Sequence, residues 1–84
     1  MPTILRNRGF RFFFYSSENG EPPHIHVEKD EAEAKYWLLP VSEVFADGFT
    51  KAQLRFIRET ITENRDLFVN SYHAYFKHSK DTRS

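Results

Sequence analysis

The sequence predicts an α+β fold, in which a small, mostly antiparallel sheet of three or four strands packs against one long kinked helix or two C-terminal helices. Three observations predict it. The first half of the chain alternates residues with the period of two that strands have, and the second half repeats apolar residues at helical spacing. The 84 residues have a single-domain length, and nine Phe, four Tyr and one Trp supply the apolar area for one core.

The first strand is expected at residues 10–15 (FRFFFY), a run of aromatic residues that favour strands. Because side chains alternate across a strand, Phe10, Phe12 and Phe14 should share one face. Residues 16–23 (SSENGEPP) are expected to form the following turn, since the Asn-Gly pair tolerates positive φ and the prolines end the loop.

The second strand is expected at residues 24–28 (HIHVE), with its two aliphatic residues facing inward. His24, His26 and Glu28 then share the outward face. A third strand is expected at residues 34–39 (AKYWLL), after a short acidic turn.

After residues 41–48 (VSEVFADG), which fit a short strand, a helical turn or a loop, the start of a helix is clear. Thr50 and Gln53 have the spacing of a capping box, in which each side chain accepts a hydrogen bond from the backbone amide of the other residue. Apolar residues then recur at helical spacing. They form one stripe: Leu54, Ile57, Ile61, Phe68, Tyr72 and Tyr75.

A single helix over residues 51–77 would be about 40 Å long. A compact chain of this size has a radius of gyration of about 12 Å and is only about 30 Å across, so this helix would overhang its domain. We therefore expect a break or kink near Asn64, a residue that tolerates the backbone conformation of a helix end. Residues 1–77 are predicted to form one domain, and residues 78–84 a flexible polar tail.

The composition predicts a cytoplasmic protein that does not associate with membranes. The formal net charge is zero, which provides no overall attraction to nucleic acid or to an acidic membrane surface. The sequence contains no cysteine, so disulfides and thiolate metal sites are excluded. Its apolar runs are too short for a membrane span, and its isolated glycines do not form a nucleotide-binding loop.

Four segments of the sequence, RNRGFRFFFYS, EPPHIHVEK, EAKYWLLPV and NRDLFVNSYHAYF, resemble the bacterial family catalogued as domain of unknown function 4160. The prolines before His-x-His are its most recognisable element, whereas Ser71 departs from the family, in which Trp is common at that place. The resemblance implies a small bacterial protein that is often encoded beside a member of domain of unknown function family 2442. Such two-gene arrangements resemble toxin–antitoxin modules.

His24 and His26 are the first candidate site. Two imidazoles two residues apart on a strand project the same way, so they could bind one divalent metal such as zinc, or act as general acid and base. A metal site needs at least a third ligand, and His73 on the last helix is the best candidate for this ligand. The alternative is a strand whose histidines hydrogen-bond to backbone or carboxylate groups and that needs no cofactor.

Arg58 and Phe56 are the other candidates. Arg58 borders the apolar stripe, and a guanidinium beside the histidines would stabilise the negative charge of the phosphorane that develops when RNA is cleaved. Its alternative role is an ordinary ion pair at the edge of the stripe. Phe56 points away from the stripe among acidic residues, which predicts a contact with a protein partner or with a second copy of the chain. On a continuous helix Leu67 also points away from the stripe, on the same side as Phe56. A helix break would turn Leu67 inward and so weaken the argument for a contact on this face.

Two functions are compatible with these features. In the first, the chain is one component of a two-gene, toxin–antitoxin-like module and acts through the protein encoded by the neighbouring gene, of the 2442 type by resemblance. In the second, it is a histidine-dependent ribonuclease or metal-assisted hydrolase. Convergence of His24 and His26 with His73 or Arg58 around a cleft would favour the enzyme. Histidines open to solvent without such partners would favour the first function.

Overall fold

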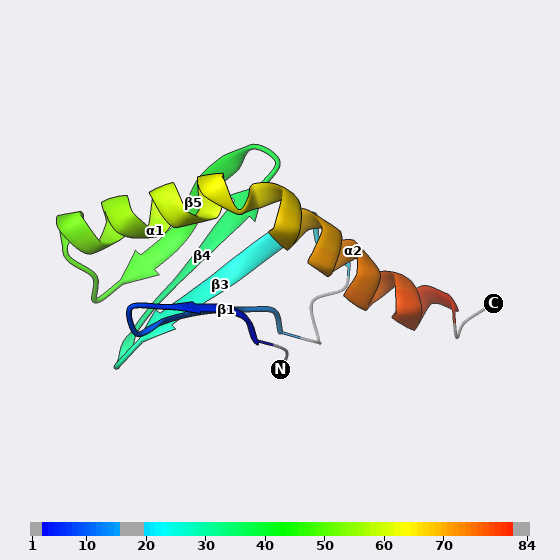
Figure 1. The fold of residues 1–84 in the computed structure, drawn as a ribbon, viewed down its shortest axis with the longest axis horizontal. Helices are drawn as coiled ribbons and strands as arrows, with labels where there is room; N and C mark the ends of the chain where they lie inside the picture. Colours follow the sequence, from blue (N-terminus) through cyan, green and yellow to red (C-terminus); the bar gives the residue numbers. More distant parts are fainter. Residues whose placement is uncertain (1–2, 16–19, 82–84) are drawn as a thin grey trace.

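The structure is a computed structural model that describes residues 3–15 and 20–81, with side chains described up to Phe76. This part of the chain contains five strands and two helices (Figure 1). They are β1 (Thr3–Asn7), β2 (Phe10–Phe13), β3 (His24–Lys29), β4 (Ala32–Leu38), β5 (Val41–Asp47), α1 (Lys51–Glu63) and α2 (Arg65–Asp81). The α+β fold class is therefore confirmed.

The strands form one antiparallel sheet in the order β1-β2-β3-β4-β5, so each strand pairs with its neighbours in sequence. The prediction of three or four strands is wrong, because the sheet of the described residues has five. The unpredicted strand is β1, which a tight turn joins to β2. Arg8 and Gly9 both have positive φ in this turn. The ambiguous segment 41–48 supplies β5.

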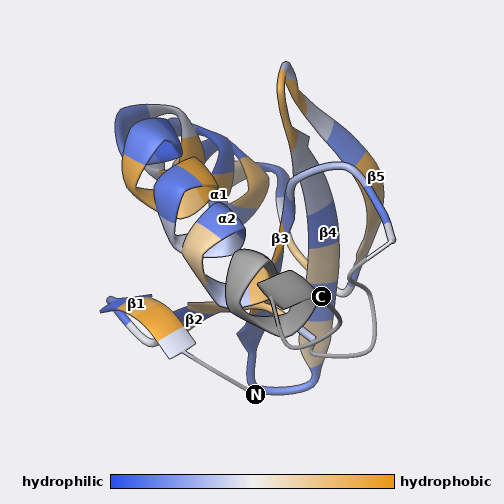
Figure 2. Ribbon diagram, turned by 90° about the vertical axis from the view of Figure 1, so that its right-hand side faces the viewer, coloured by the Kyte–Doolittle hydropathy of each residue, from blue (hydrophilic) through white to orange (hydrophobic). Residues whose placement is uncertain are grey.

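One face of the sheet packs against both helices and forms the main core. The predicted alternation is confirmed, because the aromatic residues at positions 10, 12 and 14 and the aliphatic residues of β3 are buried in this core. Figure 2 shows β1 and β2 below the helices and β3, β4 and β5 beside them, so the sheet curls around the helical layer. From the helices, the core receives Ile57, Ile61, Phe68, Tyr72 and Phe76.

Both ends of α1 follow local hydrogen-bonding rules. At its start, the Thr50 hydroxyl accepts from the Gln53 N–H at 3.1 Å, and Gln53 Oε1 accepts from the Thr50 N–H at 2.8 Å, which confirms the capping box. The predicted break at Asn64 is also present. The side-chain amide and the backbone N–H of Asn64 donate to the carbonyl oxygen of Thr60 at 2.8 and 3.0 Å. Leu67 does not turn inward after this break, since 48% of it is exposed.

α2 extends past the sheet (Figure 1), and the longest dimension of the molecule is 44 Å although its radius of gyration is only 12.7 Å. The helix reaches Asp81, inside the segment 78–84 predicted as a tail. None of the helices in the described residues is long and apolar enough to cross a membrane. The predicted turn before β4 is present, with Asp30 at a φ of 55°. Residues 16–19 of the earlier predicted turn, and residues 82–84, lie outside the described residues.

Candidate functional site

His24 and His26 lie on the outer face of the sheet, which is the face directed away from the main core, as the alternation along β3 predicts. They are not open to solvent, because their exposed fractions are 0% and 3%. Their ring centroids are 5.3 Å apart. Strand pairing places Trp37 beside His24, and Phe13 and Lys35 on either side of His26. The imidazoles therefore belong to a second buried layer.

Aromatic rings enclose His26. The Tyr15 ring meets it edge-on with centroids 4.4 Å apart, and the Phe13 ring stacks on it with centroids 5.6 Å apart. On the polar side, His26 Nδ1 lies 3.6 Å from Glu33 Oε2, the same carboxylate oxygen that accepts a hydrogen bond from the Tyr15 hydroxyl at 3.1 Å. Tyr15 thus covers the imidazole and also positions its carboxylate neighbour.

His24 is enclosed by the end of the β2–β3 connection and by α2. Its Nδ1 lies 2.9 Å from the carbonyl oxygen of Pro22 and 3.9 Å from Glu21 Oε1. The Tyr72 ring of α2 lies 5.4 Å from the His24 ring, and its hydroxyl donates to the carbonyl oxygen of Glu21 at 2.6 Å. Glu21 also forms an ion pair with Lys35. A buried imidazole beside a backbone acceptor and aromatic rings is typical of a position that stabilises the fold.

His73 does not join the histidine pair. It is exposed on α2, where its ring lies 6.0 Å from that of Tyr72. Among the described residues, no three His, Asp or Glu side chains are grouped so that they could hold a metal ion. His73 therefore does not supply the third ligand of the metal site predicted from His24, His26 and His73, and two imidazoles alone do not make a metal site.

Arg58 does not approach the histidines either, because α1 covers the opposite face of the sheet. It is exposed, and its Nη2 donates to the carbonyl oxygen of Val41 at 3.2 Å.

Nearby, the buried Tyr36 donates its hydroxyl proton to Glu43 Oε1 at 3.4 Å. Burial first, and then the charge and hydrogen bond of Glu43, raise the pKa of Tyr36 above its ordinary value of 10.0, while the charge of Arg58 acts in the opposite direction.

The raised pKa of Tyr36 predicts a loss of stability in alkali. In the unfolded chain the phenol loses its proton near pH 10, whereas the folded chain retains it, so the free energy of unfolding falls as the pH rises above about 10. Below that pH, Tyr36 contributes no pH dependence. Urea denaturation between about pH 8 and about pH 11 tests this expectation. Tyr36→Phe should show a smaller alkaline loss than the natural chain, and parallel profiles for the two proteins would contradict the prediction.

Phe56, the residue for which a partner contact is predicted, packs against residues of its own chain. Its ring packs against Phe10 with centroids 5.0 Å apart, and the guanidinium carbon of Arg8 lies 5.4 Å from its centroid. Phe56 is therefore half-buried and holds the β1–β2 hairpin against α1.

The sequence did not predict that β5, from a segment that also fitted a helical turn or a loop, forms an open edge of the sheet. The pairing of β4 with β5 joins Lys35 to Phe45 and Tyr36 to Glu43, and so passes over Val44. Such a bulge re-aims side chains and places two of them next to each other. The large hydrophobic residues that are exposed in the described part of the chain include three on or just before this strand: Leu39, Val44 and Phe45.

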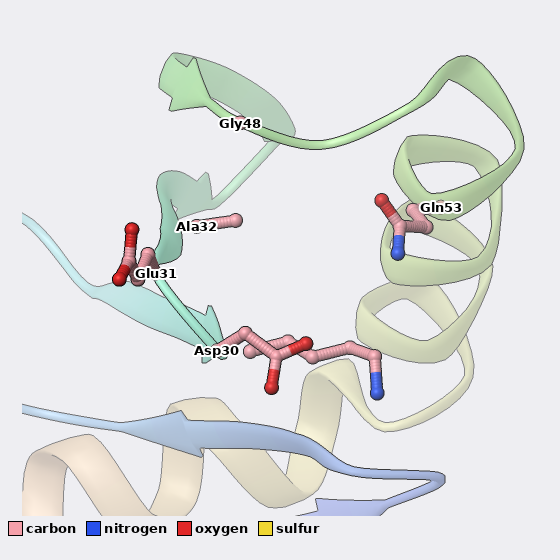
Figure 3. A pocket seen from close by; sticks show the side chains of 6 residues that line it. Asp30, Glu31, Ala32, Gly48 and Gln53 are labelled. Carbon is pink, nitrogen blue, oxygen red and sulfur yellow. The ribbon is translucent and has the colours of Figure 1, made fainter.

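A hollow of about 370 Å³ lies beside the β3–β4 turn and the first turns of α1 (Figure 3). Figure 3 shows that Asp30, Glu31 and Gln53 do not point toward a common centre. The hollow therefore does not present a catalytic set of side chains. Its lining residues are Lys29, Asp30, Glu31, Ala32, Gly48 and Gln53.

The fold and its sites define a small α+β domain in which an antiparallel meander curls around two helices, the histidines are buried and one strand edge is open. Residues 9–73 match the family described as Domain of unknown function (DUF4160). The chain belongs to this family, so the resemblance seen in its sequence is confirmed. No curated protein and no solved structure matches the chain.

Proposed function

We propose that this chain is one component of a two-gene, toxin–antitoxin-like module and that it acts by binding the protein encoded by the neighbouring gene. The observation that carries this proposal is the exposed apolar edge of β5. Edge strands present unpaired backbone N–H and C=O groups, and proteins usually protect them with charges, prolines or short length. β5 also has exposed charges, Glu43 and Asp47, but Val44 and Phe45 between them are both exposed.

The opposite edge of the sheet supports this interpretation by comparison. β1 has the exposed side chain of Arg6, while its apolar residues Ile4 and Leu5 are partly buried against the core. It is thus protected in the usual way. Only at β5 does an open edge coincide with exposed apolar side chains among the described residues, and such surfaces mark sites of protein association.

The burial of the histidines favours this proposal over a histidine-dependent ribonuclease or metal-assisted hydrolase. A general acid or base must come within hydrogen-bonding distance of the reacting group. His24 and His26 are 0% and 3% exposed and packed against the rings of Tyr72 and Tyr15, so a substrate would have to displace neighbouring side chains to reach either imidazole. Partner binding at β5 needs no such rearrangement.

Phe45→Lys is expected to weaken the complex with the neighbouring gene's protein by about tenfold or more, since a charge would replace an apolar contact at the centre of the interface. Leu67→Lys is the matched control, because Leu67 on α2 is 48% exposed and Phe45 is 43% exposed. Co-expression followed by affinity capture and calorimetry measures the effect. An unchanged affinity for Phe45→Lys, or a loss caused by Leu67→Lys alone, would remove β5 as the interface.

A further inference from the structure

We infer that the partner binds β5 through an extended segment that adds as a new strand to the open edge, and that this segment has an apolar residue beside Phe45 and a lysine or arginine beside Asp47. The inference rests on the proposed function and specifies the chemistry of the partner. It derives from a row of charged residues that ends at this edge.

The register of the sheet places five charged residues in one row across the outer face: Arg6, Arg11, Glu28, Glu33 and Asp47. The row begins with two cations, Arg6 and Arg11, and Arg11 Nη1 lies 3.1 Å from Glu28 Oε2. Glu33 then stands directly between Glu28 and Asp47. Like charges that are directly opposite on neighbouring strands destabilise a sheet. The row is thus positive at β1 and β2 and negative at β3, β4 and β5.

Asp47 is the last member of this row and borders the open edge. It is exposed, and no lysine or arginine among the described residues lies within ion-pair distance of it. A strand added beyond β5 would extend the row by one residue. A basic residue at that place would face Asp47 and relieve the repulsion from Glu33, which gives the added strand a favourable contact that an acidic or apolar residue lacks.

The next row of the outer face explains why the partner segment needs an apolar residue beside Phe45. Phe45 pairs with Lys35 on β4 and lies two residues before Asp47, so both side chains share the outer face. A pairing strand would therefore place one residue beside Phe45 and another, two residues away, beside Asp47. The first must be apolar to cover the exposed Phe45 ring. In recognition by strand addition, backbone hydrogen bonds provide affinity and such side-chain positions provide specificity.

A second copy of the chain is a poorer occupant of this edge. β5 itself contains Glu43 and Asp47 but no lysine or arginine, so the β5 strand of another copy would bring no countercharge. The β1 strand of another copy contains Arg6, but its apolar side chains already pack on their own core. A β1-to-β5 contact would also be head-to-tail and would produce open chains of copies rather than a closed dimer.

Asp47→Lys tests the inference, with Asp66→Lys on α2 as a control that makes the same change in net charge at a well-exposed site. The affinity of each protein for the neighbouring gene's product is measured by calorimetry over a range of salt concentrations. We expect Asp47→Lys to weaken binding about tenfold at low salt and to abolish most of its salt dependence, and Asp66→Lys to change neither.

Misfolding cannot mimic this result. Because the ammonium group that Asp47→Lys introduces would face Glu33, the melting temperature of the isolated variant should not fall. If the partner binds Asp47→Lys as tightly as the natural chain, the inference is wrong but the proposed function stands. If the natural chain binds no partner, the proposed function itself fails. Concentration-dependent chains of the protein alone that dissociate on Asp47→Lys would show that a second copy occupies the edge, and would overturn the inference.

Discussion

Phe13→Ala is expected to lower the free energy of unfolding by about 4 kcal/mol, as much as the same change at Phe12 on the opposite face of the sheet. Both rings are fully buried. Phe12 stacks on Phe68 of α2 in the main core, with centroids 5.6 Å apart. Phe13 is enclosed on the outer face, where the Arg11 guanidinium carbon lies 4.2 Å from its centroid and the Tyr15 ring 5.0 Å from it. At β2, the sheet is thus covered on both faces.

Urea denaturation of Phe12→Ala, Phe13→Ala and Phe45→Ala measures the effect, with Phe45 as the exposed aromatic control. The control should lose less than about 1 kcal/mol. For a domain of this size the total stability is roughly 4–13 kcal/mol, so either core variant would lose from about a third to all of it. A cost of less than about 1 kcal/mol for Phe13→Ala would mean that the outer face is open to solvent, and the burial of the histidines would then be in doubt.

Much of the fold follows from local patterns in the sequence. The alternation along residues 10–15 and 24–28 correctly assigned the side chains that enter the main core, and the capping box and Asn64 correctly predicted the limits of α1. β1 was missed because Thr3-Ile4-Leu5 is a short apolar run whose pairing depends on a turn at Arg8 and Gly9. No periodicity marks such a strand.

The environment of the candidate site could not be predicted, because it depends on contacts between distant segments. The alternation rule placed His24 and His26 together and away from the main core, which is correct. Whether the outer face meets water depends on Tyr15, on Glu21 and on Tyr72, which lies 51 residues from Glu21 and bonds to its carbonyl oxygen. For the same reason, the sequence could not show that β5 ends the sheet and leaves Phe45 uncovered.

Replacing His26 by phenylalanine instead of alanine separates the shape of the imidazole from its chemistry. His26→Ala should lower the free energy of unfolding by about 3 kcal/mol, since it removes a ring that is packed between Phe13, Tyr15 and His24. His26→Phe retains an aromatic ring of similar size and should cost only about 1 kcal/mol. Glu33, which lies 3.6 Å from the imidazole, is partly exposed and can be solvated when the nitrogen is lost.

The same two variants distinguish the two functions when the chain is expressed in bacteria with and without the neighbouring gene. Replacing both His24 and His26 by alanine cannot distinguish the two functions, because unfolding alone would abolish the effect of the chain on growth. If the chain acts by binding its partner at β5, His26→Phe should bind that partner like the natural protein and have the same effect on growth. In a histidine-dependent enzyme, by contrast, His26→Phe would remain folded and lose its effect completely, because carbon cannot replace an imidazole nitrogen in proton transfer. A folded His26→Phe protein that has lost its effect would therefore favour the enzyme and reject partner binding as the function of this chain.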